Sequence, residues 1–194
     1  MNNKNFYVML VNPPWAGPNT FVDDEIPFSI DDGVLLDDTA FEFDVKLLVD
    51  KLASDPSGFP PCDIHKIPGG GYLFSQRLVE LLQRLGIDNI QYFNANVTYQ
   101  SNPQKLTYKA ANILGVVSAL DMDASEVVLS RKGSVIAIEK MVLDEIRLQG
   151  HKMVRLFESV MHVIVHKTVK EAIETEGFTG FMFVSDDKFN MSML

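Results

Sequence analysis

The most regular hydrophobic pattern lies near the C-terminus, where two apolar runs flank a short amphipathic stretch. Residues 162–166 and 181–184 are the apolar runs, and each predicts a strand. Between them, Thr168 and Glu171 have the spacing of a capping box, so we expect a helix that begins with Thr168 as its N-cap and ends at Gly177. This order predicts either a βαβ unit or a helix laid across an antiparallel sheet.

A second amphipathic helix is predicted at residues 75–85, with its apolar side chains on one face. Ser75 is a suitable N-cap for this helix, and Gly86 is a suitable terminator. Residues 89–98 follow as a strand, but their imperfect alternation leaves open which side faces the core. The glycines at 69–71 lack the flanking residues of a phosphate-binding loop, so we interpret them as a turn into the helix.

Other apolar runs predict shorter strands at residues 6–12, 33–36, 113–120, 127–129, 134–143 and 153–157. Together with the two helices, these strands predict an α+β fold with mixed or antiparallel sheets, a few short helices and an irregular acidic N-terminal segment. The Pro-rich residues 55–61 interrupt the pattern. We therefore predict an N-terminal segment at residues 1–60, packed on an α+β domain at residues 61–194.

Negative charge is concentrated in one stretch of the sequence. The 194 residues include 17 Lys and Arg against 26 Asp and Glu, for a formal net charge of −9. Between Asn5 and Val45 there is no Lys or Arg, and the acidic residues there are Asp23, Asp24, Glu25, Asp31, Asp32, Asp37, Asp38, Glu42 and Asp44. The rest of the chain is balanced, so the whole net charge comes from this stretch.

The segregated charge disfavours nucleic-acid binding, which needs clustered Lys and Arg, and favours a partner with a basic surface. Trp15 lies in a polar part of the same stretch and is a candidate aromatic anchor. We therefore predict that Trp15 and these acidic residues form a partner-binding surface. Two alternatives stay open, namely that the acidic stretch serves solubility and that Trp15 covers a sheet edge.

Candidate catalytic and metal-binding groups are sparse in the sequence. Cys62 and His65 have the spacing of a thiol–imidazole pair or of half a metal site, but there is no second cysteine. His162 and His166 would point to one face of a strand, where packing is more common than ligation. Paired aspartates elsewhere lack the spacing of an EF-hand. We therefore predict no catalytic residue, no metal site and no cofactor.

The chain lacks the marks of export or of membrane insertion. Its longest apolar runs are about six residues, whereas a spanning helix needs about 20. The polar N-terminus has no signal-peptide core or cleavage site, and a single cysteine excludes an intrachain disulfide. We expect a cytoplasmic protein that does not bind membranes.

Two parts of the sequence resemble a bacterial toxin-immunity protein family, the eleventh in the usual catalogue. Residues 75–93 are similar to its central motif, and the strand, capped helix and Gly-containing return strand at residues 155–183 are similar to its C-terminal pattern. The resemblance covers about residues 70–185. It implies an α+β domain that binds and neutralises a cognate toxin in the producing cell, and it implies no catalytic residue.

The leading hypothesis is therefore a non-enzymatic immunity protein whose partner is a toxin or effector with a basic surface. One alternative is a small hydrolase whose Asp, Glu and His residues converge only in the fold, and another is an adaptor subunit of a secretion system. Two carboxylates converging in an apolar cleft would favour the hydrolase. The identity of the toxin and the oligomeric state stay open.

Overall fold

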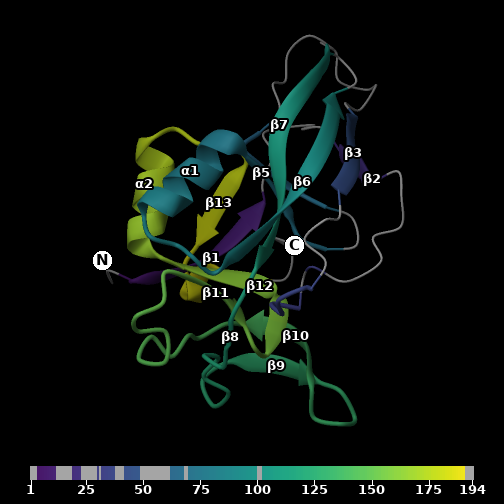
Figure 1. Ribbon diagram of the computed structural model, residues 1–194. Helices are drawn as coiled ribbons and strands as arrows, with labels where there is room; N and C mark the ends of the chain where they lie inside the picture. Colours follow the sequence, from purple (N-terminus) through teal and green to yellow (C-terminus); the bar gives the residue numbers. More distant parts are fainter. Residues whose placement is uncertain are drawn as a thin grey trace, which may run out of the picture.

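The computed structural model (Figure 1) describes residues 4–11, 19–22, 30, 32–37, 42–48, 62–67, 70–99 and 102–190. Within these residues, the elements are β1 (Phe6–Val11), β2 (Asn19–Val22), β3 (Glu42–Leu48), β4 (Ile64–Lys66), β5 (Tyr72–Ser75), α1 (Gln76–Arg84), β6 (Ile90–Tyr99), β7 (Asn102–Ile113), β8 (Val116–Val117), β9 (Glu126–Leu129), β10 (Val135–Lys140), β11 (Met153–Leu156), β12 (Ser159–His166), α2 (Lys167–Thr175), β13 (Phe181–Val184) and the 3-10 helix η1 (Asp186–Lys188). These elements confirm the predicted α+β class.

A five-stranded sheet in the order β13-β1-β12-β11-β8 forms one half of the structure. β1 pairs antiparallel with both β12 and β13, so these two strands run parallel to each other on either side of β1. α2 connects β12 to β13. The predicted strand–helix–strand order is therefore confirmed as a βαβ unit, and the N-terminal strand is inserted between its two strands.

A six-stranded sheet in the order β2-β3-β6-β7-β5-β4 forms the other half. β6 and β7 form a long antiparallel hairpin, and β3 runs parallel to β6 on its outer side. β9 and β10 form a separate two-stranded sheet, which lies at the lower end of the view in Figure 1. The sheets are thus both mixed and antiparallel, as the sequence predicts.

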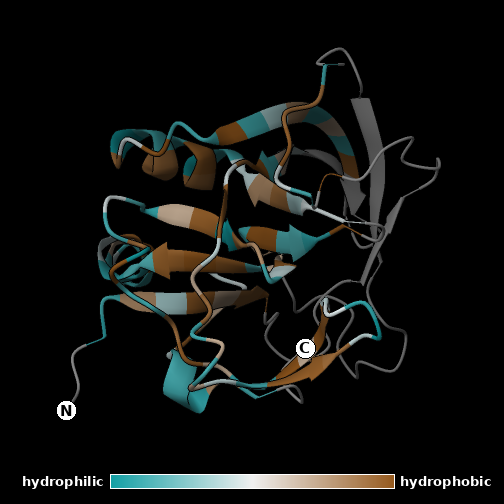
Figure 2. Cartoon of the chain, turned by 90° about the horizontal axis from the view of Figure 1, so that it is seen from below, coloured by the Kyte–Doolittle hydropathy of each residue, from teal (hydrophilic) through white to brown (hydrophobic). Residues whose placement is uncertain are grey.

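Two hydrophobic cores cover opposite faces of the five-stranded sheet, because alternate residues of its strands point to opposite sides. Met9, Val163 and Val165 pack with both helices and the six-stranded sheet in the first core. Val8 and Ile164, their neighbours along the strands, belong to the second core, beneath the β9–β10 hairpin and the loop that follows it. Figure 2 shows hydrophobic residues concentrated in the strands of this sheet.

The two helices begin and end close to their predicted bounds, but only one of the two predicted N-caps is confirmed. Ser75 caps α1, and its side chain accepts a hydrogen bond from the backbone of Leu78. At α2 the predicted cap is wrong. His166 is the N-cap and accepts a hydrogen bond from the backbone of Thr168. The extended conformation of β12 ends at His166, one turn position before the capping box, so the helix begins before Thr168 can cap it.

Three predictions for strands need correction. Residues 33–36 form no strand, since Gly33 has a φ of +70° and side-chain donors occupy the neighbouring carbonyls. The run at 113–120 is interrupted by Gly115, with a φ of +88°, which separates β7 from β8. β2 lies within the stretch predicted to be irregular. The boundary near residue 60 stays a prediction.

His166→Ala should lower the free energy of unfolding by about 1 kcal/mol, because α2 loses its N-cap hydrogen bond. His166→Asn should retain most of the stability, since Asn is a strong N-cap residue. Urea unfolding midpoints of the two variants are the measurement. Equal losses in both variants would assign the effect to the edge-to-face contact between His166 and Phe6 instead of the cap.

Candidate functional site

The residues predicted to bind a partner fall into three groups in the structure. Asp32 and Asp37 are exposed on an irregular segment, and Glu42 and Asp44 lie in β3. The others lie outside the described residues: Trp15, Asp23, Asp24, Glu25, Asp31 and Asp38. The described part of the acidic stretch that carries side-chain detail is therefore Ile30 and residues 32–37, which we call the docked segment.

The backbone of the docked segment is held by an amide side chain of β6. Gln91 Oε1 accepts a hydrogen bond from the backbone N–H of Leu36 at 3.0 Å, and Gln91 Nε2 donates to the carbonyl of Leu36 at 2.6 Å. The side-chain amide thus pairs with the backbone as a neighbouring strand would. Gln91 is itself buried, so its position is fixed by the surrounding core.

β7 and β11 supply two further buried donors to the same segment. Asn112 Nδ2 donates to the carbonyl of Val34 at 2.8 Å, and an Arg155 guanidinium nitrogen donates to the carbonyl of Ile30 at 3.1 Å. Both side chains are fully buried. Because a buried donor left unpaired costs about 1–3 kcal/mol, these contacts favour one position of the docked segment.

Ile30 anchors the segment through packing as well as through hydrogen bonding. Its side chain is fully buried above Gly71, where an added Cβ atom would lie 2.1 Å from Ile30 Cδ1. Gly71 also has a φ of +78°, which favours glycine. The function of this glycine, which the sequence suggested only as part of a turn, is to leave room for Ile30.

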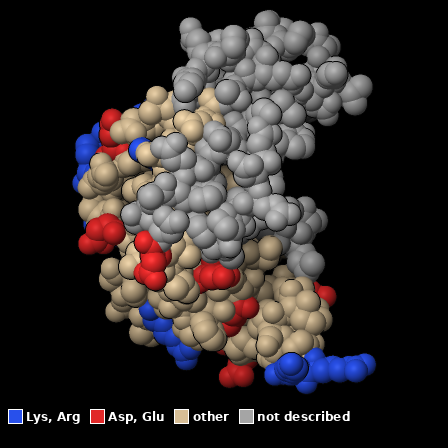
Figure 3. Space-filling view, turned by 45° about the vertical axis from the view of Figure 1, so that its right-hand side comes forward, with Lys and Arg blue, Asp and Glu red and all other residues tan. Residues whose placement is uncertain are grey.

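The outer side of the docked segment combines apolar and acidic groups. Val34 and Leu35 are 61% and 64% exposed, and they lie between the exposed carboxylates of Asp32 and Asp37. Exposed apolar residues on a fixed backbone, flanked by charge, are typical of a protein-binding surface. On the face shown in Figure 3, Asp and Glu side chains occur across the middle, whereas Lys and Arg gather toward the margins.

The sequence did not identify the three side chains that hold this segment. The signal for Gln91 is the imperfect alternation of residues 89–98, because a polar residue stands there at a position that faces inward. Asn112 lies in β7, which the hydrophobic pattern did not predict as a strand. Arg155 is an arginine inside a strand whose residues are all buried, and a buried arginine requires acceptors from elsewhere in the fold.

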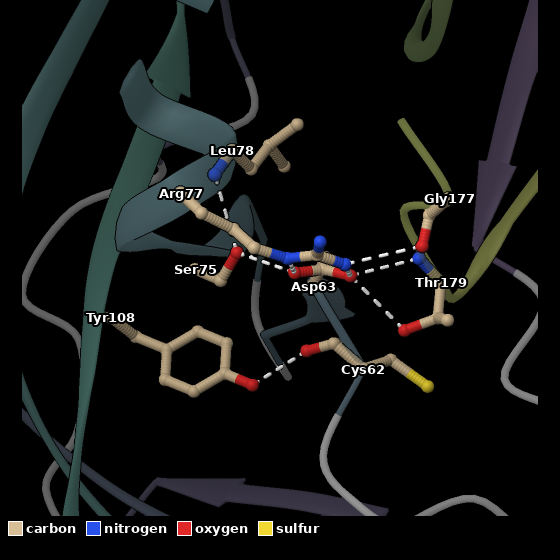
Figure 4. A network of polar contacts seen from close by, with 8 residues as sticks. All are labelled: Cys62, Asp63, Ser75, Arg77, Leu78, Tyr108, Gly177 and Thr179. Atoms are coloured by element: carbon tan, nitrogen blue, oxygen red, sulfur yellow. Dashed lines mark hydrogen bonds and ion pairs between the residues drawn. The ribbon is translucent and has the colours of Figure 1, made fainter. Parts of the chain in front are cut away.

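A second polar cluster surrounds Asp63, just before β4 (Figure 4). Arg77 Nε and a guanidinium NH2 donate to its two carboxylate oxygens, both at 2.6 Å. Ser75 Oγ donates to the carboxylate at 2.7 Å, and the backbone N–H of Thr179 donates at 2.8 Å. The cluster therefore joins the start of α1 to the loop after α2, and its geometry is that of a structural ion pair.

Competing influences act on the pKa of Asp63. Burial is the largest and raises it, but hydrogen bonds from Arg77, Thr179 and Ser75 together outweigh burial, so the pKa lies below its ordinary value. Asp63 is therefore ionised at neutral pH. All its described partners donate to the charged form, which leaves it unsuited to act as a general acid or base.

The neighbouring Cys62 and His65 do not form an activated thiol–imidazole pair. Burial raises the pKa of the Cys62 thiol, so the thiol stays protonated at neutral pH. Burial lowers the pKa of His65 to about 4, and its ring packs against Tyr108 with centroids 5.8 Å apart. The hypothesis of a nucleophilic cysteine at this position is therefore wrong for the folded protein.

The two histidines of β12 have separate local partners. His162 is buried, with Nδ1 2.8 Å from Ser159 Oγ, whereas His166 Nδ1 lies 2.9 Å from Thr168 Oγ1 at the start of α2. In the part of the chain that the structure describes, no three His, Cys, Asp or Glu side chains are placed to hold a metal ion. Nor does this part contain a helix with the length and hydrophobicity to cross a membrane.

Comparison with known proteins gives one match. Residues 17–186 match the sequence model of the immunity protein family Imm11, which therefore covers most of the chain. The matched residues include the docked segment, the Asp63 cluster and both helices. No curated protein is similar enough in sequence to count as a match.

Gly71→Ala should lower the free energy of unfolding by about 2–4 kcal/mol, because a positive φ and a clash with Ile30 act together. Gly133→Ala is the matched control. Gly133 has a φ of +83° but no atom within 4 Å of the added Cβ, so its loss should be about 1 kcal/mol. Equal losses in urea unfolding would contradict the packing of Ile30 above Gly71.

Stability should fall as the pH drops from about 6.5 to about 4, because the unfolded chain protonates His65 before the folded protein does. The full effect of His65 is about 3 kcal/mol. Burial also lowers the pKa of His162, which adds to the same slope. His65→Phe should reduce the slope of unfolding free energy against pH, whereas His151→Gln, at an exposed site, should leave it unchanged.

Proposed function

The chain belongs to the immunity protein family Imm11, and from this premise we propose that it binds a cognate toxin and neutralises it in the cytoplasm of the producing cell. The proposed action is binding alone, without catalysis. The proposed contact surface is the docked segment together with the acidic residues on either side of it in the sequence and Trp15.

One observation carries this proposal. Buried side chains from three strands hold the backbone of the docked segment, while Val34 and Leu35 remain exposed between two carboxylates. A segment that is already ordered loses less conformational entropy on binding, so more of the contact energy appears as affinity. Apolar side chains at the centre with charges at the rim are also the usual anatomy of a protein interface.

Charge supports a toxin with a basic surface at this position. The acidic stretch carries the whole net charge of −9, and opposite charge on a partner accelerates association. Exposed charges mainly affect the association rate, whereas buried apolar contacts mainly affect dissociation. The two kinds of contact in the docked segment can therefore be separated by kinetics.

The first test is protection of cells. A toxin encoded beside the gene of this protein should stop growth when it is expressed alone, and co-expression of the wild-type chain should restore growth. Arg155→Ala removes a donor to the docked segment but also a buried core side chain, so its folded fraction must be measured in parallel. A chain that binds no toxin encoded beside it and protects no cells would contradict the proposed function.

The second test is binding kinetics with the purified toxin at two salt concentrations. The double variant Asp32→Asn/Asp37→Asn should lower the association rate about three- to tenfold at low salt, with a smaller effect at high salt. The control Glu139→Gln/Glu171→Gln removes two exposed carboxylates elsewhere and should leave the rate unchanged. Equal effects of the two double variants would show that overall charge, not the docked segment, attracts the toxin.

Leu35→Ala should instead raise the dissociation rate about tenfold, since an exposed leucine that becomes buried in a complex stabilises it by apolar contact. Ile146→Ala is the control, because Ile146 is 76% exposed and lies far along the chain in the loop after β10. A dissociation rate that responds to Ile146→Ala but not to Leu35→Ala would move the interface away from the docked segment.

A further inference from the structure

The β9–β10 hairpin has one covered side and one uncovered side. Val127 and Val135 pack against the second core, and Ile138 is buried in it. Val128, Leu129 and Ile136 of the same hairpin are exposed, and Ile136 is 67% exposed. A two-stranded sheet is marginally stable by itself, so the apolar uncovered side is a surface that gains stability when a second layer covers it.

The charges of the hairpin are separated along its length. Arg131 and Lys132 lie in the turn at its tip, which is closed by hydrogen bonds between Ser130 and Ser134. At the opposite end, the base, the acidic residues Asp121, Asp123, Glu126 and Glu139 outnumber the single basic residue Lys140. A strand of four residues spans about 13 Å, which exceeds the screening length of about 8 Å at physiological ionic strength. Each end therefore interacts with the charges that it meets directly.

We propose that the uncovered side of this hairpin binds the same side of a second copy of the chain, around a two-fold axis that sets each basic tip against the partner's acidic base. A two-fold interface must be complementary to itself, and a hairpin with opposite charges at its two ends meets this requirement in the antiparallel orientation. The exposed valine, leucine and isoleucine side chains then form the apolar centre of the interface, between two charged ends.

The charge of the hairpin favours a second copy over the toxin as its occupant. The docked segment presents carboxylates without a described basic neighbour in the segment, whereas the hairpin presents both signs at separate places. A basic toxin would be repelled by Arg131 and Lys132. The inference is independent of the proposed function, because it concerns only the association of the chain with itself.

The two copies are expected to pack face to face instead of joining their strands edge to edge. The pairing of β9 with β10 contains two register shifts, one at Ile136 and one at Glu139. Such bulges interrupt the row of backbone groups that a further strand would need. Side-chain contacts between the uncovered sides are therefore the contacts that hold the dimer together.

The test is the oligomeric state of the full chain in solution, measured by sedimentation velocity. The wild-type protein should be dimeric at about 100 µM and should dissociate on dilution. Ile136→Lys should weaken the dimer at least about tenfold, because it places charges at the apolar centre. The control Ile146→Lys changes an equally exposed isoleucine outside the hairpin and should remain dimeric.

A charge-exchange experiment tests the antiparallel arrangement. Arg131→Glu/Lys132→Glu should be monomeric, because its acidic tip meets an acidic base, and Glu126→Lys/Glu139→Lys should be monomeric for the opposite reason. A mixture of the two variants should form a one-to-one heterodimer, since both contacts in that pair join opposite charges. Retained circular dichroism spectra and unfolding midpoints show that each variant is folded.

Three results would overturn the proposal. One is a wild-type chain that is monomeric at about 100 µM. Another is a dimer that Ile146→Lys disrupts and Ile136→Lys does not, which would place the interface elsewhere. The last is a hairpin variant that loses toxin binding while the wild-type chain shows no self-association, which would assign the uncovered side to the toxin.

Discussion

The guanidinium of Arg155 is fully buried and donates to backbone carbonyls from separate parts of the chain. It lies in β11 and reaches Ile113 at the end of β7, Val160 in β12 and Ile30 in the docked segment. Removal of a charge from water is costly, so these carbonyls must be in place for the arginine to be buried at all. Its burial therefore makes the two large sheets and the docked segment depend on one another.

A second buried charge has a similar role on the side of the helices. Asp63 ties the N-terminus of α1 to the loop after α2, and Arg77 also stacks over the ring of Phe178, with Cζ 4.2 Å from the ring centroid. The docked segment and the helix pair are thus each secured by a charged group whose partners come from distant parts of the sequence. Apolar packing alone would fix these parts less uniquely, because it is not directional.

The sequence predicts local features well and long-range ones poorly. Ser75 and Gly86 mark α1 because capping depends on neighbouring residues, and the strands flanking α2 follow from apolar runs of suitable length. Thr168 satisfied the same rule and was still the wrong cap, since pairing of β12 with β1 sets where extended structure ends. Gln91, Asn112 and Arg155 could not be assigned, because their partners lie 42 or more residues away.

The position of β1 in the middle of its sheet affects when the protein can fold during synthesis. Val11 pairs with Phe181, so about 170 residues must be translated between the two strands. At about 5–20 residues per second this takes roughly 10–30 s, during which the apolar β1 has neither of its neighbours. Contacts this distant in sequence also slow folding itself. A newly started chain therefore cannot complete this sheet until its last strand has left the ribosome, and during that interval β1 is a natural client for a chaperone.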